Sequence, residues 1–319
     1  MNYRGWKAID LCLESIATMV SKTITFEVII IDNFSNDGQF PFFKEKYPKF
    51  TILENSGNNG FSNGCNVGAR MATGNHFLFL NPDTKITFEA LETLLQTAVS
   101  HPEIGILSCL QINENDVFYK QNNLFPALGR FLGVSRAIFR KLNKTKLEKR
   151  FNTTADLFYP DWVTGAVVFI NRDWYTKING WNEDYWLYFE DVDLCKKITD
   201  IGGKVAVTRK ATIFHQHGGA SRLNIKTKAL TKTEVIISKH TYISNQFAYG
   251  IQIYLHSLII IGVLFEKLIL SVISIFLFFI PKLKVNRLML KNLCAYYLNA
   301  IKKQTWISPR AINYLQTKY

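Results

Sequence analysis

Short apolar segments alternate with amphipathic ones through the first two thirds of the chain, and this alternation constrains the fold most. Residues 27–32 form an apolar run that ends in a carboxylate and a turn-rich segment. Runs that are apolar on both faces are typical of parallel strands covered by helices. Further strands are predicted at 50–54, 76–80, 104–110, 163–170, 204–207 and 211–215. Helices are predicted at 60–72, 88–100, 172–178 and from 190 to 202. Strands and helices in turn, with short links, indicate an open α/β sheet.

The net charge of +13 is concentrated in the last third of the chain. Residues 1–221 carry 24 Lys and Arg against 23 Asp and Glu, whereas residues 222–319 carry 14 against 2. The last third also holds the longest apolar runs. Basic and apolar character together indicate a membrane surface, whereas a nucleic-acid binder carries its cations on a polar face. We therefore predict a globular domain at 1–221, a membrane-associating helical tail at 222–319, and no nucleic-acid partner.

Two apolar runs in the tail, 251–265 and 268–280, are separated by Glu266 and Lys267. Neither run alone spans a hydrocarbon core of about 30 Å at about 1.5 Å per residue. Three arrangements fit: one span with an internal ion pair, a re-entrant hairpin, or helices lying in the interface. A core helix pair or a dimer interface is the alternative without a membrane, and the sequence sets no oligomeric state. Cations directly after the second run place that flank on the cytoplasmic side.

The cysteines and the first residues also predict a cytosolic location. The five cysteines lie far apart and form no CxxC pair, which argues against a disulfide framework or a zinc site. The first five residues lack the pattern of a secretory leader. We therefore expect the chain at the cytoplasmic face of the cell membrane.

Polar side chains lie where the apolar strands end or a helix begins: Asp32, Asp83, Glu190, Asp191 and His215. Singly, each has a plain explanation as a turn residue, a helix cap or a core histidine. Together they suit sugar transfer from a nucleoside diphosphate. The leaving diphosphate needs a divalent cation, which a carboxylate and an imidazole can hold. An acceptor hydroxyl needs a carboxylate base. Asp32 is expected near the base or ribose, because ligands bind at the carboxyl ends of such strands.

The segments that carry these residues resemble family 2 glycosyltransferases. Five of them match in order and at similar spacing: 28–38, 58–68, 79–83, 189–195 and 215–221. Within the family, the motifs most resemble those of the bacterial rhamnosyltransferase-like enzymes that build cell-surface polysaccharides. The resemblance implies the GT-A fold, an open and mostly parallel sheet with helices on both faces. It also implies hexosyl transfer by a single in-line displacement with inversion at the anomeric carbon.

The resemblance implies a role for each matching residue. Asp32 matches the aspartate that contacts the nucleobase, and Asp83 matches the last position of the DxD metal motif, here Asn-Pro-Asp. Asp191 matches the catalytic base, with Glu190 beside it as a support or acceptor contact. His215 matches a histidine that completes the metal site in several relatives. The cofactor is then Mg²⁺ or Mn²⁺.

Further substrate contacts are predicted around these residues. A glycine-rich helix start offers backbone N–H groups to the nucleotide or diphosphate through Asn59, Gly60 and Asn63. A tight turn under the sheet is the alternative. Gly165 resembles the position where the backbone passes under the donor sugar, and a plain strand glycine is its alternative. Trp186 or Tyr188 is expected to stack on an acceptor sugar, with core packing as the alternative.

The sequence departs from the family at its beginning. Relatives start with several apolar residues that form a strand before the Asn-Tyr pair, seen here as Asn2 and Tyr3. We expect either a start further upstream or a sheet with an exposed gap.

These features predict an inverting, metal-dependent glycosyltransferase. It would move a sugar, with rhamnose from dTDP-rhamnose as the first candidate, to a cell-surface polysaccharide or lipid-linked glycan. One alternative is a truncated, inactive nucleotide-binding relative that serves as a membrane-associated assembly subunit. Another is a soluble nucleotide-binding protein with an oligomerisation helix.

Overall fold

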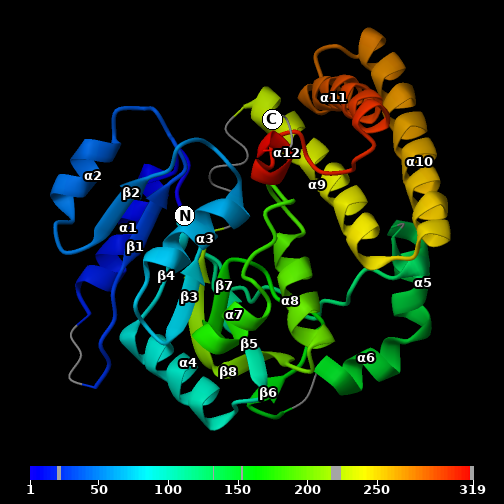
Figure 1. The fold of residues 1–319 in the computed structure, drawn as a ribbon. Helices are drawn as coiled ribbons and strands as arrows, with labels where there is room; N and C mark the ends of the chain where they lie inside the picture. Colours follow the sequence, from blue (N-terminus) through cyan, green and yellow to red (C-terminus); the bar gives the residue numbers. More distant parts are fainter. Residues whose placement is uncertain (20–22, 132, 152–153, 217–223, 317–319) are drawn as a thin grey trace. The chain divides into compact units, whose positions relative to one another are not determined.

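The computed structural model describes residues 1–19, 23–131, 133–151, 154–216 and 224–316 (Figure 1). The chain forms two compact units. The first comprises Met1–Asn58, Gly64–Trp181 and Asp191–His217, and the second comprises Asn59–Asn63, Asn182–Glu190 and Gly218–Tyr319. The domain boundary expected after residue 221 lies outside the described residues, and so do most of the residues of the fifth family-like segment.

A six-stranded sheet forms the centre of the first unit. Its strands are β3 (His76–Leu80), β4 (Thr84–Lys85), β5 (Ile104–Ile112), β6 (Leu157–Phe158), β7 (Val167–Asn171) and β8 (Lys204–His215). Their order is β3-β7-β5-β8-β4, and β6 pairs with β8. Two further strands, β1 (Ile29–Asp32) and β2 (Thr51–Glu54), form a separate parallel ladder. Among the described residues, no strand pairing joins this ladder to the central sheet.

The α/β fold class is confirmed, but the sheet is mixed where a mostly parallel one was expected. Only β1–β2 and β5–β8 run parallel, whereas β3–β7, β5–β7, β4–β8 and β6–β8 run antiparallel. Strands covered on both faces read as apolar runs whatever the direction of their neighbours. The hydropathy pattern therefore locates the strands without their directions.

Among the described residues up to 216, the four helices predicted from the sequence are present, and four more, at residues 6–17, 40–46, 133–142 and 144–151, were not predicted. Six of them lie in the first unit: α1 (Trp6–Ala17), α2 (Phe40–Lys46), α4 (Phe88–Ser100), α5 (Gly133–Leu142), α6 (Lys144–Phe151) and α7 (Arg172–Lys177). The other two, α3 (Phe61–Met71) and α8 (Glu190–Asp200), begin in the second unit and continue in the first. The Thr87 side chain caps α4 by accepting from the Ala90 N–H, so α4 begins where its apolar period begins.

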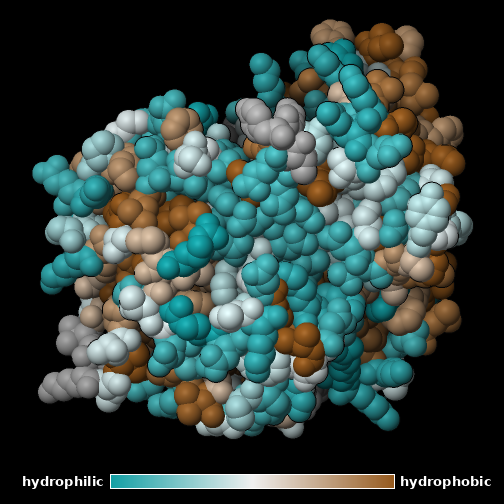
Figure 2. Space-filling view, viewed as in Figure 1, coloured by the Kyte–Doolittle hydropathy of each residue, from teal (hydrophilic) through white to brown (hydrophobic). Residues whose placement is uncertain are grey.

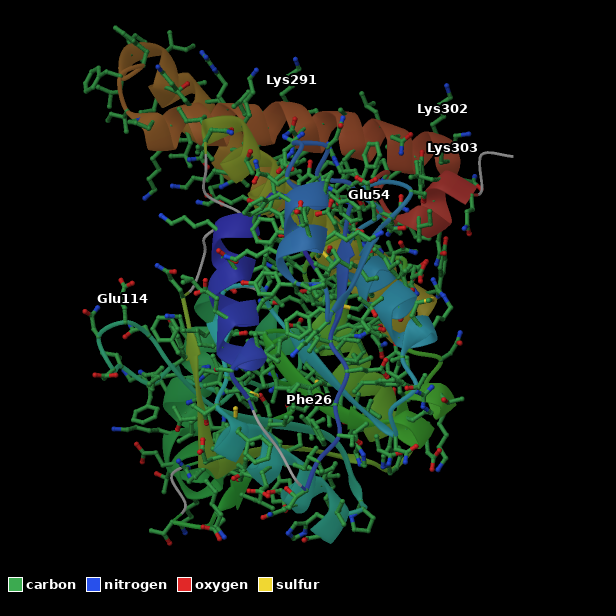
Figure 3. The ribbon with its side chains drawn as sticks, turned by 90° about the vertical axis from the view of Figure 1, so that its left-hand side faces the viewer. Phe26, Glu54, Glu114, Lys291, Lys302 and Lys303 are labelled. Carbon is green, nitrogen blue, oxygen red and sulfur yellow. The ribbon has the colours of Figure 1, made fainter. Side chains whose placement is uncertain are left out.

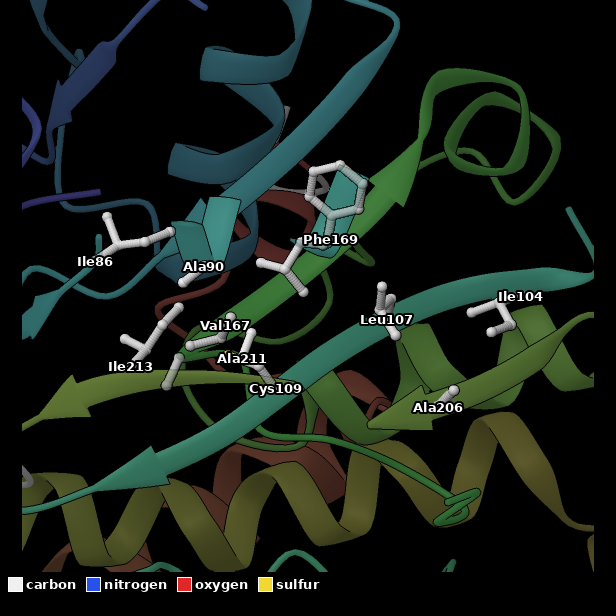
Figure 4. Close-up of a cluster of buried hydrophobic side chains, with 12 residues drawn as sticks. Ile86, Ala90, Ile104, Leu107, Cys109, Val167, Phe169, Ala206, Ala211 and Ile213 are labelled. Atoms are coloured by element: carbon white, nitrogen blue, oxygen red, sulfur yellow. The ribbon is translucent and has the colours of Figure 1, made fainter. Parts of the chain in front are cut away.

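A cluster of buried apolar side chains joins α4 to the sheet (Figure 4). Leu94 of α4 is fully buried, and so are Cys109 of β5, Val167 of β7 and Ala206 of β8. Two short strands were predicted at 204–207 and 211–215, and the structure joins them into the single strand β8. A register shift between Cys109 and Leu110 skips residues 209–211, so β8 continues through its polar middle as a bulge.

The tail folds as four helices of the second unit. They are α9 (Ile225–Gln246), α10 (Tyr249–Phe276), α11 (Pro281–Lys303) and α12 (Ile312–Gln316). The first apolar run and residues 268–276 of the second lie in one helix, α10, so the chain does not turn between the runs at Glu266 and Lys267. Within this helix Lys267 is largely buried, and its ammonium binds the Glu266 carboxylate at 2.7 Å.

Helix α10 is long and apolar enough to cross a membrane, by length and composition. Its most apolar 18-residue window has a mean hydropathy of 2.4, and only 17% of that window is buried. Much of the brown surface along the right-hand side of Figure 2 belongs to this helix and its C-terminal turn. The tail therefore exposes many large apolar side chains along a single helix.

Candidate active site

Asp83 and His215 are brought together by a strand pair of only two residues, β4 with β8. Strand β3 ends at Leu80, and the turn that follows reverses the chain into β4, where Thr84 pairs with His215 at the end of β8. The Asp83 carbonyl also accepts a hydrogen bond from the Gln216 N–H at 2.8 Å. As a result the Asp83 Oδ1 lies 3.4 Å from the His215 Nε2.

Gln111, at the end of β5, orients the His215 ring. Its Oε1 lies 2.8 Å from the His215 Nδ1. An oxygen acceptor there places the imidazole proton on Nδ1 and leaves the Nε2 lone pair facing Asp83. Tyr119 fixes the backbone of the same residue, because its hydroxyl donates to the His215 carbonyl at 3.2 Å. The ring is thus held in one tautomer and one orientation within a buried setting.

Asp191 lies in the first turn of α8. The Gly165 N–H donates to its Oδ2 at 3.1 Å, and the Val192 N–H donates to its Oδ1 at 2.8 Å. Burial raises the pKa of Asp191 to about 6, although both of these hydrogen bonds favour the charged form. A carboxylate with this pKa can accept a proton near neutral pH and later release it.

A short series of contacts connects the Asp83–His215 pair with Asp191. The Gln111 amide donates to the Thr164 hydroxyl at 3.4 Å, and Thr164 directly precedes Gly165, which binds Asp191. The structure therefore places Asp83, His215 and Asp191 in one connected neighbourhood at the ends of β4, β5, β8 and α8. Their chemical roles stay predictions.

Asp83 and His215 suit a divalent cation as a pair of ligands. A carboxylate oxygen and an imidazole nitrogen are donors that Mn²⁺ accepts, and an acceptor behind the imidazole is typical of such ligands. Among the described residues, no cluster of three His, Cys, Asp or Glu side chains is placed to hold an ion. The other positions around a cation would then be filled by diphosphate oxygens and water.

The Asp32 carboxylate accepts hydrogen bonds from neighbouring residues of the fold. Its side chain is fully buried, accepts from Asn2 at 2.8 Å, and accepts from both the N–H and the hydroxyl of Ser35 at 2.9 and 2.6 Å. These bonds fix the turn after β1. Contact of Asp32 with a nucleobase stays a prediction.

Asn59, Gly60 and Asn63 belong to the second unit. Gly60 has a φ of +97°, and a Cβ there would lie 2.6 Å from the Trp186 carbonyl oxygen. That carbonyl accepts from the Phe61 N–H at 2.9 Å, and the Asn63 amide donates to Glu183 at 2.9 Å. The segment thus contacts the loop at 182–190, and both diphosphate contact and the tight turn under the sheet stay predictions.

The loop that ends at Glu190 is strained. Tyr188 and Phe189 adopt φ values of 73° and 68° in succession, a left-handed conformation that costs side chains other than glycine of order 1–3 kcal/mol each. The Ser238 hydroxyl holds the loop by donating to the Leu187 carbonyl at 2.9 Å. Trp186 is largely buried below it. Stacking of Trp186 or Tyr188 on an acceptor stays a prediction, as does the support role of Glu190.

Sequence reasoning missed the residues that position the site. Gln111, Tyr119 and Thr164 were not proposed, because none belongs to a family-like segment. The one available signal is Gln111 itself, a polar residue near the end of an otherwise apolar strand. The residue types of Tyr188 and Phe189 do not predict their left-handed backbone conformation.

Comparisons with known proteins identify the family of the chain. The family model described as Glycosyl transferase family 2 matches residues 1–212. Rhamnosyltransferase WbbL of Escherichia coli is 28% identical over 134 residues, 42% of this chain and 49% of that protein. The N-acetylglucosaminyl-diphospho-decaprenol L-rhamnosyltransferase of Mycobacterium tuberculosis is 24% identical over 230 residues, 67% of this chain and 74% of that protein. The chain thus spans about half the length of the first of these relatives.

Solved structures show the same fold. A mannosyltransferase from Pyrobaculum calidifontis superposes with a TM-score of 0.52 at 14% identity, over 77% of this chain and 63% of that one. GalNAc-T7 superposes with a TM-score of 0.51 at 16% identity, over 66% of this chain and 41% of that one. At these identities the likeness concerns the fold alone, which is the GT-A fold.

Proposed function

The chain belongs to glycosyl transferase family 2, and from this premise we propose that it is an inverting, metal-dependent enzyme with Asp191 as its base. The observation that carries the proposal is the connection from the Asp83–His215 pair through Gln111 and Thr164 to Asp191. These contacts connect Asp83 and His215, which can bind a cation, with Asp191, which can accept a proton. Sugar transfer from a nucleoside diphosphate needs both.

The proposed reaction is a single displacement. Asp191 takes the proton of an acceptor hydroxyl, whose oxygen forms a bond to the anomeric carbon of the donor sugar. The bond from that carbon to the diphosphate breaks, and the diphosphate leaves with the electron pair. Asp83 and His215 would hold a divalent cation, which would neutralise the charge of the leaving diphosphate. The two solved structures named above were crystallised with Mn²⁺, one with UDP and GalNAc and the other with GDP-Man.

We propose rhamnose as the donor sugar and a lipid-linked glycan as the acceptor. Two relatives support this choice by name: one is a rhamnosyltransferase, and the other acts on an N-acetylglucosaminyl-diphospho-decaprenol. A lipid-linked acceptor also suits the exposed apolar helix of the tail, because enzyme and acceptor would share one membrane surface.

A donor panel tests the proposal. With Mn²⁺ present, dTDP-rhamnose is expected to raise the midpoint of thermal unfolding by several degrees, since a ligand at 100 times its Kd stabilises by about 2.7 kcal/mol. UDP-N-acetylglucosamine and GDP-mannose serve as matched controls. Release of dTDP from dTDP-rhamnose, measured by chromatography, then reports turnover. Stabilisation without turnover would favour the inactive nucleotide-binding subunit, and no response to any donor would contradict both functions.

Membrane attachment of the tail forms a second part of the proposal. Large apolar side chains are exposed along α10, among them Ile261, Phe265, Leu268, Val272 and Phe276. Lys291, Lys302 and Lys303 point outward from α11 (Figure 3). The Glu266 side chain, near the middle of α10, is 57% exposed. A helix that spans the bilayer would carry this carboxylate into hydrocarbon, so we propose that α10 lies in the interface of the cytoplasmic face.

Vesicle binding tests this attachment. The chain is expected to sediment with vesicles that contain phosphatidylglycerol, and less so at high salt. Replacing Ile261, Phe265 and Phe276 together by Asp is expected to weaken binding by at least about 100-fold, because each buried side chain contributes about 1.5–3 kcal/mol. Val99→Asp, at an apolar position of the first unit that is 65% exposed, is the matched control. Equal binding by all three proteins would contradict the proposal.

A further inference from the structure

Helices α5 and α6 carry a positive charge that neighbouring acids do not neutralise. Residues 130–150 hold eight Lys and Arg against one acid, Glu148, although residues 1–221 as a whole are close to neutral. The Glu148 carboxylate lies 3.9 Å from the Lys144 ammonium. Within the described part of the chain, four exposed cations of these helices have no ion pair: Arg136, Lys141, Lys146 and Lys149. Their charge is therefore open to an anionic partner.

The inner face of this helix pair is attached to the first unit. The Arg140 guanidinium donates to the Asn122 carbonyl at 3.2 Å, and the Phe139 ring is half-buried. At the end of α6 the Phe151 side chain is buried, and the Phe151 carbonyl accepts from the Arg209 guanidinium at 2.8 Å. These contacts fix which faces of α5 and α6 point to solvent.

The outer face of α5 combines large apolar side chains with cations. Ile138 and Leu142 are 54% and 79% exposed, and they adjoin on one face of the helix because they are four positions apart. Lys141 lies beside them, and it is exposed as well. Single exposed apolar side chains are ordinary, but a pair of them beside cations is typical of helices that lie in the lipid interface. A nucleic-acid site would instead place polar side chains between its cations.

We propose that α5 and α6 form a lipid-binding surface for an anionic membrane, called here the α5–α6 surface. Ile138 and Leu142 enter the boundary between headgroups and acyl chains, and the stem of Lys141 lies along them with its ammonium among the phosphates. The other three cations without an ion pair bind lipid phosphates around this contact. The surface belongs to the first unit, so it is separate from the exposed helix α10 of the tail. The proposal holds whether or not the chain transfers sugar.

Neutralising lysines tests the charged part of the α5–α6 surface. One variant combines Lys141→Gln, Lys146→Gln and Lys149→Gln. The matched control has the same net charge and combines substitutions at exposed lysines elsewhere in the first unit: Lys7→Gln, Lys44→Gln and Lys49→Gln. Each Lys or Arg near an anionic leaflet strengthens binding about fivefold, so the first variant is expected to bind phosphatidylglycerol vesicles at least about tenfold more weakly than the control. Equal binding by the two variants would overturn the proposal.

An environment-sensitive probe tests the apolar part of the surface at one position. Leu142→Cys is labelled with the fluorophore NBD in a chain that also carries Cys294→Ser, because Cys294 is exposed whereas the four other cysteines are buried. Val99→Cys, at a 65% exposed apolar position of α4, is the control. When vesicles of phosphatidylcholine and phosphatidylglycerol are added, NBD emission at position 142 is expected to shift to the blue and emission at position 99 to stay unchanged. Vesicle binding without a shift at 142, or no vesicle binding at all, would contradict the proposal.

Two further measurements separate this surface from misfolding and from another partner. The urea midpoints of all variants are expected to match that of the native chain, since every substitution described for this surface lies at an exposed position. Binding to polyuridylate is expected to be equal for the two lysine variants. A loss of polyuridylate binding that is confined to the α5–α6 variant, with no blue shift at 142, would assign the surface to nucleic acid and overturn the proposal.

Discussion

Replacing Asp191 by asparagine is expected to lower kcat for sugar transfer by about 10²–10⁴-fold, the usual contribution of a general base. Asparagine keeps the size of the side chain, and its single oxygen can still accept from one of the Gly165 and Val192 N–H groups, but it loses the second acceptor and cannot take a proton. Donor affinity should change little, since the role assigned to Asp191 concerns the acceptor. Asp200→Asn, at the other end of α8, is the matched control.

The pH dependence of transfer provides a second readout of the same residue. Because burial raises the pKa of Asp191 to about 6, the native enzyme is expected to lose activity about tenfold per pH unit below 6 and to level off above it. The Asp191→Asn variant should lose this limb of the profile. A variant that keeps more than a tenth of native activity, or keeps the same limb, would contradict the assignment.

Stability should change in the opposite direction to activity. A carboxyl group with a raised native pKa contributes most to stability when protonated, and that contribution declines as pH rises from about 4 to about 6. The difference between about 6 and the ordinary value of 3.8 corresponds to at most about 3 kcal/mol. Above pH 6, Asp191→Asn should therefore unfold at a higher urea concentration than the native chain. An unchanged or lower urea midpoint would show that the buried charge has another partner.

The sequence predicts local elements of this fold better than it predicts their pairing. The bounds of β3 and α4 agree with the apolar pattern because each is fixed by its own period and caps. The direction of β7 depends on where the chain returns after residues 113–166, which no local pattern records. The single helix α10 likewise depends on packing that covers Lys267, a charge that reads as a break in the apolar pattern.

The candidate site shows the same contrast between residues that the sequence identifies and contacts that it does not predict. Asp83, Asp191 and His215 were identified because they follow strands or begin a helix, and the structure places all three in one neighbourhood. Their contacts depend on the β4–β8 pair and on Gln111, both non-local. Asp32 was identified by the same rule, yet the structure uses its carboxylate to hold Asn2 and Ser35. Position at a strand end thus selects candidates, and their hydrogen-bond partners within the fold cannot be predicted from that position.

Removing either proposed metal ligand is expected to raise the Mn²⁺ concentration for half-maximal activity by at least about 100-fold. Only two protein side chains are proposed to bind the ion, so a single substitution would leave it with one. Asp83→Asn and His215→Gln are the two variants, and His101→Gln, at a partly exposed histidine, is the control. If both side chains hold one ion, their effects should be strongly non-additive, and the double variant should be little worse than either single one. Additive effects, or an unchanged Mn²⁺ requirement, would contradict a shared site.

Gln111 allows the positioning of His215 to be tested apart from ligation. Gln111→Leu removes the acceptor that keeps the imidazole proton on Nδ1, and loss of such a partner typically lowers metal affinity about 10–100-fold. Gln111→Glu keeps an oxygen acceptor at the same reach and should restore most of the affinity. A purely structural role predicts that both variants lose stability without a selective change in the Mn²⁺ requirement. Rescue by glutamate, measured as Mn²⁺ affinity by electron paramagnetic resonance, would therefore locate the effect at the Nδ1 hydrogen bond and assign Nε2 to the ion.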